Sequence, residues 1–225
     1  MMEKIRLAFC TPKALERRFL IMQNYVITIT RQFGSGGRDI ALAVAKELGI
    51  PMYDRSNIEK EAQAMDESLC SLVQLTERGI TGYYQMAYPL GVGSSLKQDR
   101  MFEVQSQLVM QHAEQENCVI LGRCADYLLR ERDNVIRCYI FAPYQARIVR
   151  SIHTLGCTAA EPQRIIEEVD KARAEYYRTH TGCEVNNTRY RDIFLNSNLL
   201  GIEGSAKLLV EAARHKFHLP ETTEK

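Results

Sequence analysis

A glycine-rich segment near the start of the chain has the residue types that bind phosphate. It follows the apolar run 25–30 and reads RQFGSGGRD over residues 31–39. Glycine permits positive φ angles and close approach of the backbone, so successive N–H groups can point at an anion, and a following helix adds the positive end of its dipole. We therefore expect a phosphate-binding loop here. Its residues are Gly34, Ser35, Gly36, Gly37, Arg38 and Asp39.

The loop lacks the lysine that most loops of this kind carry. The common pattern for binding nucleotide phosphates is G-x-x-x-x-G-K-[ST], in which the lysine reaches the β- and γ-phosphates. No lysine lies between Thr30 and Ala45. If the loop supports catalysis as well as binding, another cation must do the work of the lysine.

Polar residues also follow the other apolar runs that read as strands. Residues 54–60 follow a short run, residues 122–126 follow a second, and Asn196 ends the last. The carboxyl ends of parallel strands meet at one edge of a sheet, where ligands of such folds bind. We therefore expect these clusters and the glycine loop to form one site. The alternative for each cluster by itself is a solvated turn.

Apolar periodicity supplies the elements that must position this site. Short apolar runs predict buried parallel strands, and apolar residues at spacings of three and four predict the helices between them. The order predicts an α/β domain, a parallel sheet of about five strands flanked by helices. The expected strands are 25–30, 51–54, 118–121, 135–141 and 193–195. The expected helices are 40–48, 56–64 (with Ser56 as its N-cap), 144–154, 162–178 and 202–217.

The chain is predicted to be one domain, residues 25–218. Residues 1–24 form an N-terminal extension in this interpretation, with Met22 as an alternative start, and residues 219–225 form a polar tail. Residues from about 55 to 116 are polar and helical, which predicts a helical insertion. Residues from about 156 to 190 are rich in charge and predict a lid.

Composition excludes several classes of protein. With 29 Lys and Arg against 28 Asp and Glu, the formal charge is +1, so no overall field favours nucleic acid or a membrane surface. No run approaches the roughly 20 apolar residues of a membrane-spanning helix. The seven cysteines show no C-x-x-C pairing, which is typical of reduced thiols in a cytoplasmic protein. The apolar content of 69–109 suggests a possible homodimer.

Basic residues gather in the last third of the chain. Phosphoryl transfer needs cations around the transferred group, because its catalysis is mostly positioning and charge stabilisation together with Mg²⁺. The alternative for each arginine alone is a weak surface ion pair. We select Arg173 and Arg178 as catalytic candidates, because they lie five residues apart at the end of the expected lid. The full set is Arg147, Arg150, Arg164, Lys171, Arg173, Arg178, Arg189 and Arg191.

Over residues 25–217 the chain resembles the cytidylate kinase-like family of the P-loop nucleoside monophosphate kinases. The likeness rests on VITI at 26–29 before the loop and on AVAKEL at 43–48 after it. It implies a P-loop fold, ATP as the donor with Mg²⁺, and a nucleoside monophosphate as the acceptor, held by the helical insertion.

The resemblance also implies roles for single residues. Asp54 and Lys60 stand where the family has an aspartate and an arginine for the acceptor phosphate. Arg123 stands in the family's Gly-Arg-Asp, but Cys124 replaces the aspartate, so Asp126 is a substitute for it. Arg173 and Arg178 resemble the lid arginines.

The resemblance breaks down inside the loop. Counted without a gap from Val26, the family's two loop glycines fall on Arg31 and Gly36, and its lysine falls on Gly37. A slip of one residue puts Arg38 in the place of the lysine. We therefore expect Arg38 to clamp the donor phosphates and Asp39 to bind the metal. Asp39 has a second interpretation, since the helix dipole alone favours an acid in the first turn.

Three functions remain open at this point. The first is transfer of the γ-phosphoryl group of ATP to a nucleoside monophosphate or a similar small acceptor. The second is a nucleotide-binding module that has lost catalysis and acts by ligand-dependent closure or by partner binding, which the missing lysine favours. The third is a kinase with a non-nucleotide acceptor, which Cys124 favours.

Overall fold

The computed structural model describes residues 24–69, 95–155 and 161–220. Nearly all of the expected N-terminal extension, residues 70–94 of the insertion, residues 156–160 of the expected lid and the end of the tail lie outside these residues.

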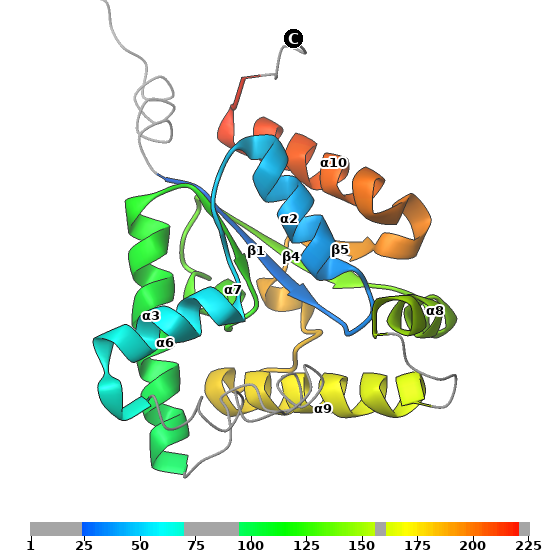
Figure 1. Ribbon diagram of the computed structural model, residues 1–225. Coiled ribbons are helices and arrows are strands. Elements are labelled where there is room, and N and C mark those ends of the chain that lie inside the picture. Colours follow the sequence, from blue (N-terminus) through cyan, green and yellow to red (C-terminus); the bar gives the residue numbers. More distant parts are fainter. Residues whose placement is uncertain (1–23, 70–94, 156–160, 221–225) are drawn as a thin grey trace, which may run out of the picture.

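A five-stranded parallel sheet forms the centre of the domain (Figure 1). Its order is β2-β3-β1-β4-β5, so β1 lies in the middle with β3 and β4 beside it. The predicted α/β fold class is confirmed, and each strand lies where its apolar run predicts it. The strands are β1 (Val26–Arg31), β2 (Met52–Tyr53), β3 (Cys118–Leu121), β4 (Val135–Phe141) and β5 (Ile193–Asn196).

Helices connect the strands and cover both faces of the sheet (Figure 1). The predicted helices 40–48, 56–64, 144–154 and 162–178 match to within three residues at each end, whereas the long helix at 95–115 lies where the sequence predicted only a helical insertion. The α-helices are α2 (Gly37–Leu48), α3 (Arg55–Met65), α6 (Ser95–Gln115), α7 (Ala125–Leu128), α8 (Tyr144–Leu155), α9 (Glu161–Thr181) and α10 (Ser197–Phe217). The short 3₁₀ turns are η1 (Glu67–Leu69) and η2 (Thr188–Tyr190).

Two helix starts differ from the sequence prediction for local reasons. Asp54, and not Ser56, is the N-cap of α3, because its carboxylate accepts from the backbone N–H groups of Ser56 and Asn57. The last helix begins at Ser197 rather than Ile202. Its first turn is separated from the rest by Gly201, whose φ of 67° no ordinary helix contains, so the apolar period starts only after this break.

The core has two layers because side chains alternate across the sheet. Ile27 and Ile29 of β1 pack under α2 and α10, together with Ile40 and Leu209. On the opposite face, residues such as Ile120 pack against α3, α6 and α7. This packing fixes the carboxyl ends of the strands relative to α2 and α3, the two helices that begin at the site.

Most of the large apolar residues of α6 are buried within the chain itself, although Leu96 is 79% exposed. Met101, Val104, Leu108 and Val109 of α6 are each at most 3% exposed and pack with Ile58 of α3. These four residues of α6 therefore pack inside the protein and are not available to a dimer interface; the homodimer stays a prediction. None of the described helices is long and apolar enough to cross a membrane.

Candidate active site

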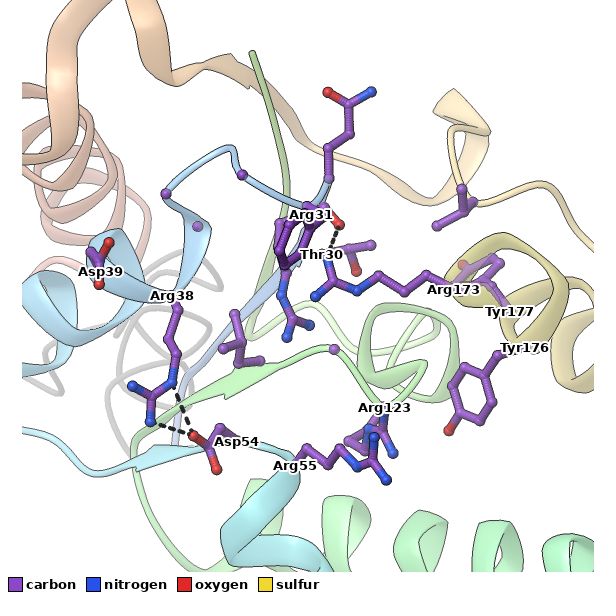
Figure 2. Close-up of a pocket in the computed structure, with 18 of the residues that line it drawn as sticks. Thr30, Arg31, Arg38, Asp39, Asp54, Arg55, Arg123, Arg173, Tyr176 and Tyr177 are labelled. Atoms are coloured by element: carbon purple, nitrogen blue, oxygen red, sulfur yellow. Dashed lines mark hydrogen bonds and ion pairs between the residues drawn. The ribbon is translucent and has the colours of Figure 1, made fainter. Parts of the chain in front are cut away.

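A cavity of about 490 Å³ lies at the carboxyl end of the sheet (Figure 2). Its walls come from the glycine loop after β1, the residues after β2 and β3, and side chains of α8 and α9. Parallel sheets bind ligands at this edge, and small-molecule sites commonly occupy about 300–1,000 Å³. The clusters that the sequence places after the first three of these strands therefore meet in one cavity. Asn196, expected at the same site, is not among the lining residues; it is the N-cap of α10, and its side chain accepts from the backbone N–H of Asn198.

The glycine loop is open towards the cavity and packed on its outside. Gly34 and Gly36 have φ angles of 72° and 75°. A Cβ atom on Gly34 would lie 2.8 Å from the backbone oxygen of Arg147, and one on Gly36 would contact Ile202. Gly36 is also the N-cap of α2 and supplies no side-chain cap. The first N–H groups of α2 therefore remain available for an anion.

Side chains of α8 and α9 hold the loop in place. Arg147 donates from Nε to the carbonyl oxygen of Phe33 at 2.8 Å and pairs with Asp170, which in turn accepts from the backbone N–H of Phe33 at 2.7 Å. Arg150 donates from Nη1 to the carbonyl oxygen of Gly34 at 3.0 Å. These bonds satisfy the outer polar groups of the loop, so its conformation does not depend on a ligand.

Gly34→Ala is expected to destabilise the protein more than Gly49→Ala, which serves as its control. Both glycines have positive φ, so either alanine costs about 1–2 kcal/mol of backbone strain. Only the alanine at Gly34 would also press on backbone, since nothing lies within 4 Å of a Cβ on Gly49. Overpacking adds about 1–3 kcal/mol. Urea unfolding of both variants measures the difference, and equal losses would contradict the packing seen around the loop.

The cavity has a strong excess of positive charge. Six arginines and two aspartates line it, an excess of four positive charges in a chain of formal charge +1. Burial lowers the pKa of Arg173 to about 10; Asp170 opposes this shift, while the charges of Arg123 and Arg147 add to it. An excess of positive charge of this size favours an anionic ligand. The arginines are Arg31, Arg38, Arg55, Arg123, Arg150 and Arg173.

Most of the residues expected from the sequence line this cavity. Arg38 pairs with Asp54 through Nη2 and Oδ2 at 2.9 Å, although the Arg38 side chain is 62% exposed (Figure 2). Burial would raise the pKa of Asp54, but the bonds from Arg38 and from backbone N–H groups lower it overall. The residues brought together are Gly34, Gly36, Gly37, Arg38, Asp39, Asp54, Arg123 and Arg173.

Arg123 also lines the cavity, and the resemblance implies a role for it in binding the acceptor. It follows β3 with a φ of 57°, donates to Oε1 of Gln105 at 3.2 Å and lies 5.0 Å from the centre of the Tyr176 ring. Its neighbour Cys124 is 2% exposed, and burial raises the pKa of its thiol to about 12. Cys124 is therefore neutral and does not reproduce the charge of the aspartate it replaces.

Four expected residues lie away from the cavity lining. Ser35 is fully buried, and its hydroxyl donates to the carbonyl oxygen of Gln32 at 2.9 Å. Lys60 is exposed on α3. Asp126 is 0% exposed and pairs with Arg191. Arg178 is on the surface, where it pairs with Glu184 at 2.7 Å. Each of these side chains has a local environment that sequence spacing does not reveal.

The carboxylates available for a metal are few. Asp39 and Asp54 are the carboxylates of the cavity lining, and Asp54 already accepts from Arg38 and from two backbone N–H groups. The described residues contain no group of three or more His, Cys, Asp or Glu suited to a metal. Mg²⁺ commonly binds through one or two carboxylates together with phosphate oxygens and water. This donor set would suit an ion that arrives with a phosphate ligand and takes one protein carboxylate.

The lining residues that sequence reasoning did not select include two arginines and two tyrosines with clear sequence signals, Arg31, Arg55, Tyr176 and Tyr177. Arg31 ends β1 and Arg55 follows β2 by two residues, so the rule that selected Asp54 applies to them as well. Tyr176 and Tyr177 follow Arg173 by three and four residues, which places all three on one face of α9.

Comparisons with known proteins agree with this fold. The model of the cytidylate kinase-like family matches residues 26–199. Cytidylate kinase of Archaeoglobus fulgidus is 24% identical over 193 residues, which cover 84% of this chain and 95% of the archaeal protein. The crystal structure of an uncharacterized protein from Eubacterium ventriosum superposes with a TM-score of 0.66 at 19% identity, covering 84% of this chain and 98% of that one. At this identity the structural likeness bears on the fold alone.

Proposed function

Because the chain belongs to the cytidylate kinase-like family, we propose that it transfers the γ-phosphoryl group of ATP, bound with Mg²⁺, to a nucleoside monophosphate or a similar small acceptor. Family homology supports a kinase-type phosphotransferase. The use of ATP as donor and of a nucleoside monophosphate or similar small molecule as acceptor is what we propose beyond this homology. The archaeal relative is a cytidylate kinase, which makes CMP the first acceptor to test.

The observation that carries this proposal is the charge of the cavity. Six arginines and two aspartates surround about 490 Å³ next to an uncapped helix N-terminus. A monophosphate ester carries about −1.5 to −2 charges at pH 7, so phosphate groups balance an excess of this size. Phosphoryl transfer spreads negative charge over the equatorial oxygens, and arginines fixed around them stabilise that state.

The lining residues divide into a donor side and an acceptor side. The loop 34–37 and the start of α2 bind the donor phosphates through backbone N–H groups. Asp54 and Arg123 lie across the cavity, after β2 and β3, and bind the acceptor. Arg173 reaches in from α9 and donates from Nη1 to the carbonyl oxygen of Arg31 at 3.4 Å, so it lies beside the loop (Figure 2). In this arrangement Arg173 contacts the transferred group.

Mg²⁺ would neutralise the donor phosphates, and Asp39 is the residue proposed to hold it. Asp39 is exposed at the start of α2, and the described residues give it no hydrogen bond or ion pair. Arg38 would reach the donor phosphates only after its pair with Asp54 opens. Binding of an acceptor beside Asp54 is one way to open that pair.

A second candidate function is nucleotide binding without catalysis. The pairing of Arg38 with Asp54 favours it, because the arginine that stands nearest to the place of the loop lysine is held away from the donor phosphates. Such a protein binds ATP without turnover. It acts by closing around the ligand or by binding a partner.

A coupled assay of ADP release distinguishes the two functions. With ATP·Mg²⁺ and a panel of nucleoside monophosphates, a phosphotransferase releases ADP only when its acceptor is present. A second panel of sugars and other small hydroxyl compounds covers non-nucleotide acceptors. ATP binding by calorimetry with no ADP release from either panel supports the binding module. Absence of both binding and turnover contradicts both functions.

A further inference from the structure

Arg31 differs from the other arginines of the cavity in having no partner. Among the residues that the structure describes, its guanidinium makes no hydrogen bond or ion pair, and only its backbone oxygen is engaged, by Arg173. Figure 2 shows its side chain pointing into the space between the loop and Arg123. The other arginines are held: Arg38 by Asp54, Arg55 by Glu59, Arg123 by Gln105, Arg150 by Gly34 and Arg173 by Arg31 itself.

Two glycines make room for the Arg31 side chain. A Cβ atom on Gly37 would lie 2.7 Å from Cβ and 2.9 Å from Cγ of Arg31. A Cβ atom on Gly122 would lie 2.6 Å from its Nη1. The side chain therefore passes the first residue of α2 and ends against the glycine that follows β3. It enters the cavity from the strand and leaves the N–H groups of the loop uncovered.

The surroundings of Arg31 make its charge unfavourable without a ligand. Burial lowers its pKa well below the ordinary value, the charges of Arg173, Arg123 and Arg38 lower it further, and Asp54 alone opposes them. A cation kept among cations is stabilised by an anion that reaches all of them. Phosphate oxygens suit the planar guanidinium, which binds them through two parallel hydrogen bonds.

We propose that Arg31 is the phosphate-binding cation of this cavity and does the work of the missing loop lysine. The inference rests on the proposed function in taking the ligand to be a polyphosphate. Arg31 stands where the family's first loop glycine is expected, so its charge comes from the end of β1 and not from the start of α2, where the family's lysine is expected. Arg38 is more exposed and is paired with Asp54, so it contributes less than Arg31 to phosphate binding.

Calorimetry with inorganic tripolyphosphate and with ATP, each with and without Mg²⁺, tests Arg31 directly. Arg31→Ala is expected to weaken both ligands about 100-fold, because it removes a bidentate charge-assisted contact. Arg31→Lys keeps the positive charge but loses the planar guanidinium, so we expect its affinity for both ligands to lie between those of the wild type and Arg31→Ala. Arg38→Ala should lose less than about tenfold, since a partly exposed pair is weak. Arg132→Ala is the matched control, because Arg132 pairs with Glu114 near residue 24, at the opposite end of the sheet.

Thermal unfolding separates a binding role from a structural one. Burial among other cations lowers the folded pKa of Arg31, so its charge opposes folding at pH values below that folded pKa. Without ligand, Arg31→Ala should therefore unfold at the same temperature as the wild type or higher. A clear fall in Tm would instead mark Arg31 as a structural residue.

The outcomes for Arg31 and for the proposed function are distinct. In one outcome, the wild type shows no turnover with any acceptor while Arg31→Ala loses tripolyphosphate and ATP binding. This result supports Arg31 as the phosphate-binding cation and contradicts the phosphotransferase function. Full affinity in Arg31→Ala, in a protein that does turn over, overturns the inference and leaves the function in place. A wild type that binds neither probe overturns both.

Discussion

Replacing Arg173 with alanine is expected to slow phosphoryl transfer by about 10²- to 10³-fold, the usual loss when one fixed donor to developing charge is removed. Arg173 extends from α9 into the cavity, where its guanidinium donates to the carbonyl oxygen of Arg31 and lies 5.7 Å from the centre of the Phe33 ring. With a pKa of about 10 it is charged at neutral pH. Steady-state kinetics with ATP·Mg²⁺ and the acceptor found in the panel measure the loss in kcat.

Arg178 provides the comparison for this variant. The sequence selects both arginines, but the structure places Arg178 on the surface with Glu184 and outside the cavity lining. Arg178→Ala should cost less than about tenfold in kcat, as expected for an exposed pair. Equal losses in the two variants would contradict the position of α9, and would require Arg178 to turn towards the cavity during the reaction.

Replacing Asp126 with alanine is expected to lower the free energy of unfolding by about 3–5 kcal/mol, because it leaves the charge of Arg191 buried without its partner. The side chains of Asp126 and Arg191 are 0% and 1% exposed, and the hydroxyl of Tyr177 donates to Oδ2 of Asp126 at 3.1 Å. Burial lowers the pKa of Arg191 to about 10, so it remains charged at pH 7. Urea unfolding at pH 7 measures the loss.

A double variant distinguishes a lost pair from a lost packing contact. Asp126→Ala combined with Arg191→Met removes both charges, and replacing a buried pair with apolar groups often costs little. The double variant should therefore be more stable than Asp126→Ala alone. If Asp126 binds the acceptor, as the resemblance implies, Asp126→Ala should instead raise KM while leaving the unfolding free energy within about 1 kcal/mol, the range of ordinary surface changes.

The strands were predictable because their signal is local. Runs such as CVIL at 118–121 are apolar at every position, which is typical of a parallel strand buried on both faces. The helix starts were harder to predict. Asp54 and Ser56 are both good caps, and only the backbone direction after β2 shows that Asp54 makes the bonds. The break at Gly201 likewise depends on a φ angle that the sequence does not contain.

The site was predictable as a region and less so as a set of side chains. The rule that ligands bind at the ends of parallel strands brought Asp54, Arg123 and the glycine loop together. It did not separate Asp54 from Lys60, since both lie on the same short segment and only one faces the cavity. Asp126 follows β3 as closely as Arg123 does, yet it turns inward to Arg191.

The sequence by itself determined that this chain forms a parallel α/β sheet with a glycine-rich loop after its first strand, because apolar runs and glycine spacing act over a few residues. Only the tertiary structure decided which cations serve that loop. Arg31, Arg123 and Arg173 lie far apart in the chain and meet only when β1, β3 and α9 pack together. Which charges a phosphate meets depends on these distances, and a sequence pattern does not contain them.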